Sequence, residues 1–126
     1  MQYLYIIKCN QFYKIGITNN VKKRLKDLQS GNPYILELIG SFEVKNPRLA
    51  ESVFHNLLSR KNVVNEWFEL NTEELSLLIE TCDLFRNSNL DYFFKVLLPK
   101  WDLYKAEQTP DGLDFNVVAA IHHITE

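Results

Sequence analysis

Residue types that bind phosphate lie close together near the start of the chain, in the stretch YLYIIKCNQFYKIGIT. Two apolar runs flank a short polar break at Asn10-Gln11, which predicts a β-hairpin with a two-residue loop. With that loop Tyr5 opposes Gly16, and Lys14 falls on the same face because side chains alternate along a strand. A phenol and an ammonium beside the space that a glycine leaves make a candidate phosphate pocket.

The same hairpin also has a purely structural interpretation. Tyrosine is a good strand residue, and a lone lysine in a strand is usually solvated at an edge of the sheet. The Tyr5 face is expected to be the more polar one, and the hairpin alone leaves both interpretations open. The opposite face carries most of the apolar side chains that we expect in the core, namely Leu4, Ile6, Tyr13, Ile15 and Ile17.

The elements around this hairpin predict an α/β (α+β) fold. Apolar alternation predicts strands at 3–8, 13–18 and 35–44, and EWFEL at 66–70 predicts a further short strand or edge segment. We expect a small three-stranded antiparallel sheet flanked by helices, with a mostly helical C-terminal extension. The predicted helices run from 21 to about 30, from 46–47 onward and over about 73–85, with caps at Asn19 or Asn20, Asn46 and Asn71.

The charges divide the chain into two unequal halves. Residues 1–62 carry ten Lys or Arg and four Asp or Glu, a balance of +6, while residues 63–126 carry four and twelve, a balance of −8, and the two sum to −2. A basic half suits a polyanion, because neutralised phosphates release counterions. We expect a domain over residues 1–86 and an acidic C-terminal extension of unknown role over 87–126, through which a homodimer could form.

Composition and cysteine usage exclude several classes of protein. The 126 residues are 46% hydrophobic and 24% charged, which is typical of a globular domain rather than a disordered chain. The sequence predicts neither a membrane span nor a signal peptide. Cys9, Cys82 and the three histidines fit no zinc-ligand spacing, so we expect reduced thiols and an intracellular protein, in the cytoplasm or in a nucleus.

Five short motifs, taken in order, resemble the GIY-YIG nuclease superfamily and in particular its T5orf172-like branch: YLYIIK, YKIGIT, RLKDLQSGNP, AESVFHNLL and NEWFEL. The resemblance covers about residues 3–80. It implies that Tyr5 stands at the catalytic tyrosine, Arg24 at the catalytic arginine and Glu51 at the metal-binding glutamate. Lys14, in KIG, stands where the second motif has a tyrosine. The tyrosine just before it points to the opposite face and does not restore the pattern.

These residue types suit hydrolysis of a phosphodiester bond, which needs an activated water and stabilisation of charge on the phosphoryl group. Glu51 would hold one Mg²⁺ or Mn²⁺, Arg24 would clamp the scissile phosphate, and Tyr5 would take a proton from water. The ordinary pKa of tyrosine, about 10, is too high for a base at neutral pH. We therefore expect Lys14 and the metal to lower that pKa.

Further residues are predicted to contact DNA. Three lysines of the first helix point away from its apolar stripe and suit contacts to the phosphate backbone. His55 lies one turn after Glu51 and either binds phosphate or a water, or has no catalytic role. The resemblance also places Asn32 and the segment EWF (66–68) in the family pattern. The complete set of predicted DNA contacts is Lys22, Lys23, Lys26, Asn32 and His55.

The resulting hypothesis is a metal-dependent DNA endonuclease that hydrolyses phosphodiester bonds by in-line attack of water with one metal ion. The rival hypothesis is a nucleic-acid-binding module that keeps the fold but cuts weakly or not at all, with Lys14 as the mark of lost activity. A third hypothesis is a regulatory protein that acts through residues 87–126. Metal-dependent nicking of plasmid DNA separates the first from the second, and a stable protein complex without DNA binding would favour the third.

Overall fold

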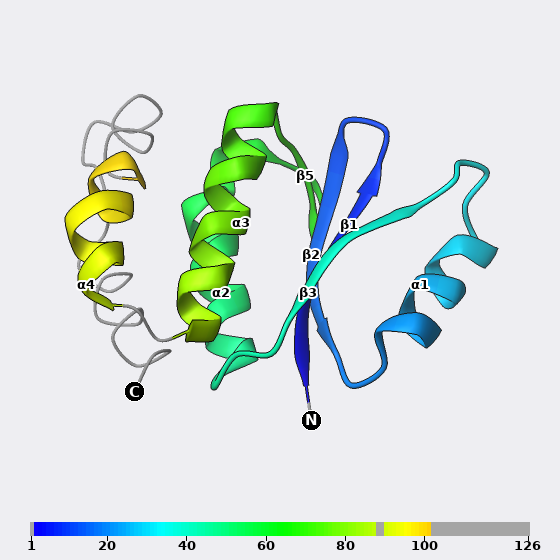
Figure 1. Cartoon of the computed structure of the whole chain (residues 1–126). Helices are drawn as coiled ribbons and strands as arrows, with labels where there is room; N and C mark the ends of the chain where they lie inside the picture. Colours follow the sequence, from blue (N-terminus) through cyan, green and yellow to red (C-terminus); the bar gives the residue numbers. More distant parts are fainter. Residues whose placement is uncertain (1, 88–89, 102–126) are drawn as a thin grey trace.

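The computed structural model describes residues 2–87 and 90–101, and the predictions for residues 102–126 lie outside this part of the chain. The helices are α1 Val21–Ser30, α2 Pro47–Leu57, α3 Thr72–Asn87 and α4 Leu90–Tyr92, with a 3₁₀ turn at Ser59–Lys61 and a π-helical turn at Phe93–Leu97. Figure 1 shows α1 on one face of an antiparallel sheet, α2 and α3 on the other, and α4 outside α3. None of these helices is long and apolar enough to cross a membrane.

Five strands form one antiparallel sheet within the described residues, in the order β3-β1-β2-β5-β4. Their bounds are β1 Tyr3–Cys9, β2 Phe12–Thr18, β3 Glu37–Phe42, β4 Asn62–Val64 and β5 Trp67–Glu69. The predicted α+β class is confirmed, but the prediction of three strands is wrong in number. EWFEL supplies β5, and β4 has no counterpart in the prediction. Each of these two strands has three residues, too few to show alternation in the sequence.

The first hairpin has the predicted register. Tyr5 pairs with Gly16 and Ile7 pairs with Lys14 across β1 and β2. Asn10, the first loop residue, has a φ angle of 56°, in the left-handed region that asparagine tolerates better than most residues. The shared face of Tyr5, Lys14 and Gly16 is therefore confirmed.

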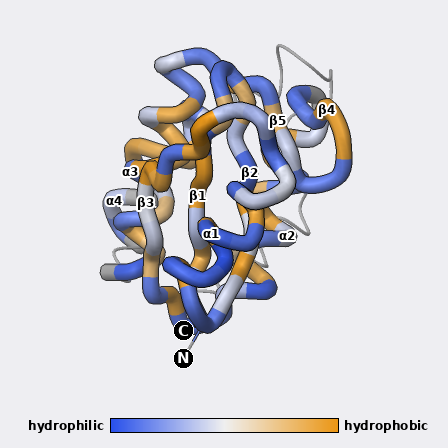
Figure 2. Tube along the Cα trace, turned by 90° about the vertical axis from the view of Figure 1, so that its right-hand side faces the viewer, coloured by the Kyte–Doolittle hydropathy of each residue, from blue (hydrophilic) through white to orange (hydrophobic). Residues whose placement is uncertain are grey.

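Both faces of this hairpin are buried, which corrects the expectation of a polar Tyr5 face. One face lies in the main core between the sheet and α2 and α3, with Leu4, Ile6, Tyr13 and Ile15. The other face forms a second cluster of Tyr5, Ile7, Cys9 and Leu36, against which Leu25, Leu28 and Trp67 pack. Figure 2 shows the hydrophilic α1 in front of β1, much of which is hydrophobic. A strand covered on both faces reads as a continuous apolar run, as YLYII does here.

Asparagine caps begin the three longer helices, as predicted. The side-chain oxygens of Asn20 and Asn46 accept hydrogen bonds from backbone amides three residues later, at 3.1 and 3.2 Å. At α3, Asn71 and Glu74 exchange two side-chain-to-backbone bonds of 2.8 Å each. The first cap fixes where α1 begins and therefore where Arg24 lies on that helix.

The described part of the C-terminal extension packs on α3 of the same chain. Leu97 and Trp101 are fully buried members of the main core. The Trp101 indole Nε1 donates to the Thr81 hydroxyl at 2.9 Å, and that hydroxyl donates to the Leu77 carbonyl at 2.7 Å. The division of the chain at residue 86 and dimerisation through the extension stay predictions.

Candidate active site

Tyr5 lies across Gly16 on the two central strands. The residue is 1% exposed, and a Cβ atom on Gly16 would stand 2.5 Å from the Tyr5 Oη and 2.7 Å from its Cζ. The glycine is therefore required for the close approach of the tyrosine ring itself. The open pocket expected beside the phenol is filled by that ring.

Arg24 is the residue that contacts the phenol. It follows the Asn20 cap by one helical turn, and its Nε donates to the Tyr5 Oη at 3.3 Å. The side chain is half-buried, and its two terminal nitrogens make no hydrogen bond to any residue that the structure describes. The guanidinium can therefore hold Tyr5 on one side and a phosphate on the other.

The pKa of Tyr5 lies above its ordinary value. Burial is the main cause, because it disfavours the charged phenolate. The hydrogen bond and charge of Arg24 act in the opposite direction, while the charges of Glu66 and Glu51 raise the pKa further. Arg24 is the group that favours the phenolate, and the expected lowering of this pKa by Lys14 and a metal stays a prediction.

The ammonium of Lys14 pairs with residues at the start of β5. Its Nζ lies 3.1 Å from the Glu66 Oε2 and 5.6 Å from the centre of the Trp67 ring. The Lys14 side chain is 9% exposed, whereas that of Glu66 is 38% exposed. The interpretation of Lys14 as a solvated edge lysine is therefore wrong, because the lysine is buried and held by a carboxylate and an aromatic face.

Glu51 lies on α2, half-buried and close enough to Glu66 for the two charges to interact. Its pKa is raised, first by burial and next by the charge of Glu66, while His55, Arg48 and Lys14 lower it. A divalent cation would relieve both causes of the rise, so the donor chemistry fits Mg²⁺ or Mn²⁺. No group of three or more His, Cys, Asp or Glu side chains among the described residues could hold a metal. The ion would therefore take its other ligands from water and phosphate, as Mg²⁺ commonly does.

His55 bonds to the backbone of β2 next to the turn that precedes β5. Its Nε2 lies 3.0 Å from the Ile15 carbonyl oxygen, while the Ile15 amide donates to the Glu66 carbonyl at 3.3 Å. Because a carbonyl only accepts, Nε2 carries the proton. The ring also packs edge-on against Phe68, with 5.1 Å between centres. In the neutral ring Nδ1 is an acceptor, which suits a water, and the predicted phosphate contact stays a prediction.

These groups follow a fixed order: tyrosine on the first strand, lysine and glycine on the second, arginine on α1 and glutamate on α2. The model of the T5orf172 domain matches residues 2–83. The chain belongs to the T5orf172 domain family. T5orf172 is a GIY-YIG-related domain, which confirms the resemblance. No curated protein and no solved structure matches the chain.

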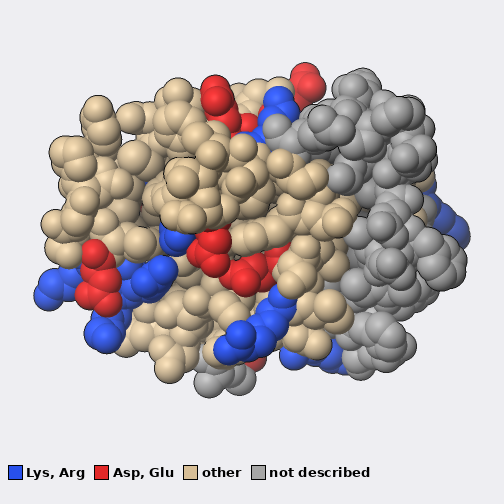
Figure 3. All heavy atoms as spheres, turned by 180° about the vertical axis from the view of Figure 1, so that it is seen from behind, with Lys and Arg blue, Asp and Glu red and all other residues tan. Residues whose placement is uncertain are grey.

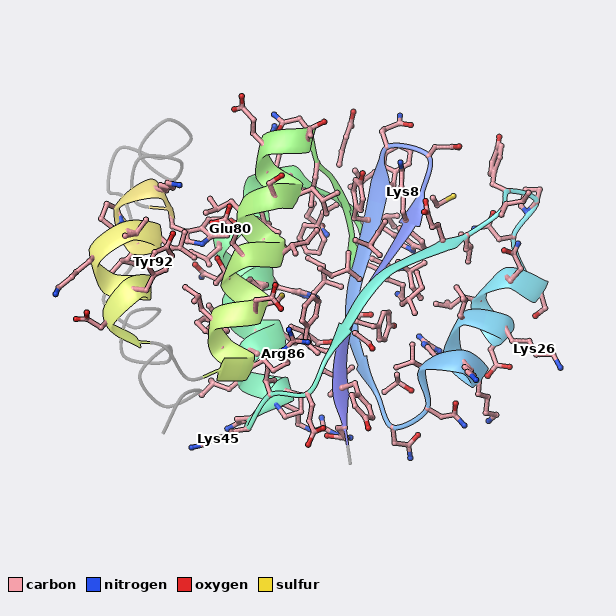
Figure 4. All side chains as sticks on the ribbon, in the orientation of Figure 1. Lys8, Lys26, Lys45, Glu80, Arg86 and Tyr92 are labelled. Carbon is pink, nitrogen blue, oxygen red and sulfur yellow. The ribbon has the colours of Figure 1, made fainter. Side chains whose placement is uncertain are left out.

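The predicted DNA contacts of this T5orf172 domain come from α1, from the turn after it and from α2. The α1 lysines (Lys22, Lys23 and Lys26) are exposed, and Figure 4 shows Lys26 pointing away from the sheet. Asn32 closes the turn after α1: its Oδ1 accepts from the Tyr34 amide at 2.9 Å, and its Nδ2 lies 3.9 Å from the Cys9 sulfur. Contacts of these residues with DNA stay predictions. A small cavity of about 210 Å³ beside the turn is lined by Cys9, Phe12, Asn32, Val63, Val64 and Trp67.

One face of the T5orf172 domain carries both signs of charge. Figure 3 shows acidic side chains near the middle of that face and Lys and Arg side chains beside them. The charge of Glu66 raises the pKa of Glu51, so these two carboxylates lie close enough to interact at the site. Basic groups attract a phosphate, whereas neighbouring carboxylates repel it unless a cation neutralises them.

Two residues of the site, Glu66 and Trp67, have no role assigned from the sequence. The only signal that singles them out is the match of EWF to the family pattern. Their contact with Lys14 depends on the pairing of β2 with β5, which aligns Lys14 with Trp67. Sequence spacing alone does not reveal that pairing.

Proposed function

We propose that this T5orf172 domain is a metal-dependent DNA endonuclease that hydrolyses phosphodiester bonds by in-line attack of water. The observation that supports it most is the hydrogen bond from the Arg24 Nε to the Tyr5 Oη at 3.3 Å. It joins the two residues that the GIY-YIG pattern assigns to catalysis. Glu51 lies close enough for its charge to act on that phenol.

Each side chain has a role that its chemistry allows. The terminal nitrogens of Arg24 hold the scissile phosphate while Nε holds Tyr5. The Tyr5 oxygen orients the attacking water and takes its proton as the phenolate, the form that the positive charge of Arg24 favours. Mg²⁺ or Mn²⁺ at Glu51 would supply charge neutralisation for the phosphoryl oxygens. Lys14 adds a second positive charge on the Tyr5 face of the sheet.

DNA as the substrate and an intracellular place of action both fit the chain. The α1 lysines are exposed on the helix that carries Arg24, so they suit the phosphates on either side of the scissile one. Cys9 and Cys82 are buried free thiols, as in proteins of reducing compartments.

A second candidate function is DNA binding without cutting. The ion pair of Lys14 with Glu66 favours it, because a neutralised lysine stabilises a phosphoryl group less than a free one. The raised pKa of Tyr5 points the same way, because a phenol that keeps its proton is a weak base.

Nicking of supercoiled plasmid in Mg²⁺ or Mn²⁺ tests the two candidates. We expect nicking by the wild type, and a loss of about 100-fold to 1,000-fold in Arg24→Gln and Glu51→Gln, as for removal of one transition-state donor. Lys95→Gln and Glu37→Gln are matched controls, since both residues are exposed and lie away from this site. A wild type that retards DNA in a gel but never cuts it would establish the second candidate. Full nicking by Glu51→Gln would exclude Glu51 as the metal ligand.

A further inference from the structure

The segment EWF supplies two contacts to a single side chain. Glu66 lies 3.1 Å from the Lys14 Nζ through its Oε2, and the ring of Trp67 lies 5.6 Å from the same atom. Trp67 is also the strand partner of Lys14 in the pairing of β2 with β5. The ammonium is therefore held from two directions by consecutive residues, Glu66 in the turn before β5 and Trp67 as the first residue of that strand.

Hydrogen bonds that do not involve Lys14 hold the backbone around Glu66. The Asn62 side-chain amide donates to the Asn65 carbonyl at 2.7 Å and to the Trp67 carbonyl at 3.1 Å. Asn65 has a φ angle of 50°, which turns the chain sharply between β4 and β5. The Glu66 carbonyl accepts from the Ile15 amide of β2 at 3.3 Å. The β4–β5 hairpin is therefore a rigid support for the Glu66 side chain.

A lysine in this position needs such a support for physical reasons. A buried ammonium without a partner is costly, and a free lysine side chain samples many rotamers. Glu66 removes the first cost, and together with Trp67 it limits the second. Glu66 itself is 38% exposed, so the carboxylate that orients Lys14 borders the solvent from which a substrate would arrive.

We propose that Glu66 is a positioning residue, which together with Trp67 holds the Lys14 ammonium toward the phosphate of the substrate. With the Lys14 ammonium held by Glu66 and Trp67, the chain uses a lysine where the GIY-YIG pattern has a second tyrosine. The inference rests on the proposed nuclease function. It differs from two other roles for Glu66, namely a direct contact with the metal or the water and an ion pair that only stabilises the fold.

A double-mutant cycle on single-turnover cleavage separates these roles. The variants are Glu66→Gln, Lys14→Met and the two combined, each checked for its unfolding midpoint in urea. We expect Glu66→Gln to slow cleavage by up to about 100-fold, as for a displaced catalytic group. In the Lys14→Met background the same change should have no further effect. Glu74→Gln is the matched control, because Glu74 is a buried carboxylate that also pairs with a lysine, at 3.5 Å from the Lys61 Nζ.

Three outcomes would overturn the proposal. Equal slowing by Glu66→Gln in both backgrounds would mean that Glu66 acts directly on the metal or the water. A shift in the urea midpoint with unchanged cleavage would mean a structural ion pair alone. Equal slowing by Glu74→Gln would mean that the loss of any carboxylate paired with a lysine slows the reaction.

An NMR measurement keeps the inference testable if no variant cuts DNA, a result that would refute the proposed nuclease function instead. The Lys14 Nζ protons should give a slowly exchanging ¹⁵N-coupled signal in the wild type, and this signal should shift when a short DNA duplex is added. In Glu66→Gln the signal should be lost. If the wild-type Lys14 signal does not shift when DNA is added, the positioning role is overturned even if the protein cuts DNA.

Discussion

Substituting Gly16 by alanine tests whether the position of the Tyr5 ring controls the reaction. The added methyl group would lie 2.5 Å from the Tyr5 Oη, about 0.9 Å inside the 3.4 Å at which ordinary contact begins. Tyr5 is 1% exposed and its ring lies between the sheet and α1, so the ring has to move within a filled space. Its hydroxyl would then leave the 3.3 Å hydrogen bond with Arg24.

The effects of Gly16→Ala on stability and on the cleavage rate can be measured separately. Overpacking of a buried ring costs about 1–3 kcal/mol of unfolding free energy, which urea denaturation would measure. A displacement of about 1 Å at a catalytic group can slow a reaction by about 100-fold. We therefore expect Gly16→Ala to remain folded but to cut plasmid DNA about 100-fold more slowly than the wild type.

Two other glycines provide matched controls. In Gly40→Ala the methyl group would lie 2.9 Å from the Cζ of buried Phe42, so a similar loss of stability should leave the cleavage rate unchanged. Gly31 has no atom within 4 Å of the added methyl group and a φ angle of −99°, so Gly31→Ala should change neither quantity. Equal slowing by Gly16→Ala and Gly40→Ala would mean that lost stability, not the displaced Tyr5 hydroxyl, slows cleavage. Wild-type cleavage by Gly16→Ala would mean that the position of the Tyr5 ring does not control the rate.

Three further predictions concern other parts of the domain. Since the folded-state pKa of Glu51 is raised, its carboxylate destabilises the fold at pH 7. Glu51→Gln should thus raise the melting temperature there, with the gain disappearing below its ordinary pKa of 4.5, and a lowered melting temperature at pH 7 would contradict this. Replacing the α1 lysines by glutamine should reduce the slope of log Kd against log salt by up to about 2.7 in fluorescence anisotropy, and an unchanged slope would exclude phosphate contacts. Thr81→Val would remove the hydrogen bond from the buried Trp101 indole to the Thr81 hydroxyl and cost about 0.5–1.5 kcal/mol in urea denaturation. Thr81→Ser should retain most of that stability, and equal losses would assign the effect to packing.

The parts of the fold that depend on local signals could be predicted from the sequence. The hairpin register follows from a two-residue loop and alternation, and each of the three longer helices begins at an asparagine that accepts from its first turn. The shared face of Tyr5, Lys14 and Gly16 follows from the same local rules. The arginine and glutamate of the site came from the ordered family motifs rather than from spacing.

The contacts that depend on distant pairing could not be predicted. The partner of Lys14 is set by how β5 aligns with β2, and β4 and β5 are too short to show a pattern of their own. The Tyr5 face was expected to be polar because it carries a lysine and a glycine. It is buried because α1 covers it and Glu66 neutralises the lysine. Neither contact can be predicted from the hairpin sequence alone.

The anchoring of Trp101 on α3 has a consequence for how this domain can be moved between proteins. The segment that the family model recognises ends at residue 83, but the core also contains Phe85, Leu97 and Trp101. A graft of residues 2–83 into another protein would therefore lack three residues of the core and would expose the side of α3 at Thr81, which Trp101 contacts. A host that accepts residues 2–83 must therefore supply a segment that covers this side of α3, so the part of this chain that the family model matches is modular only together with such a segment.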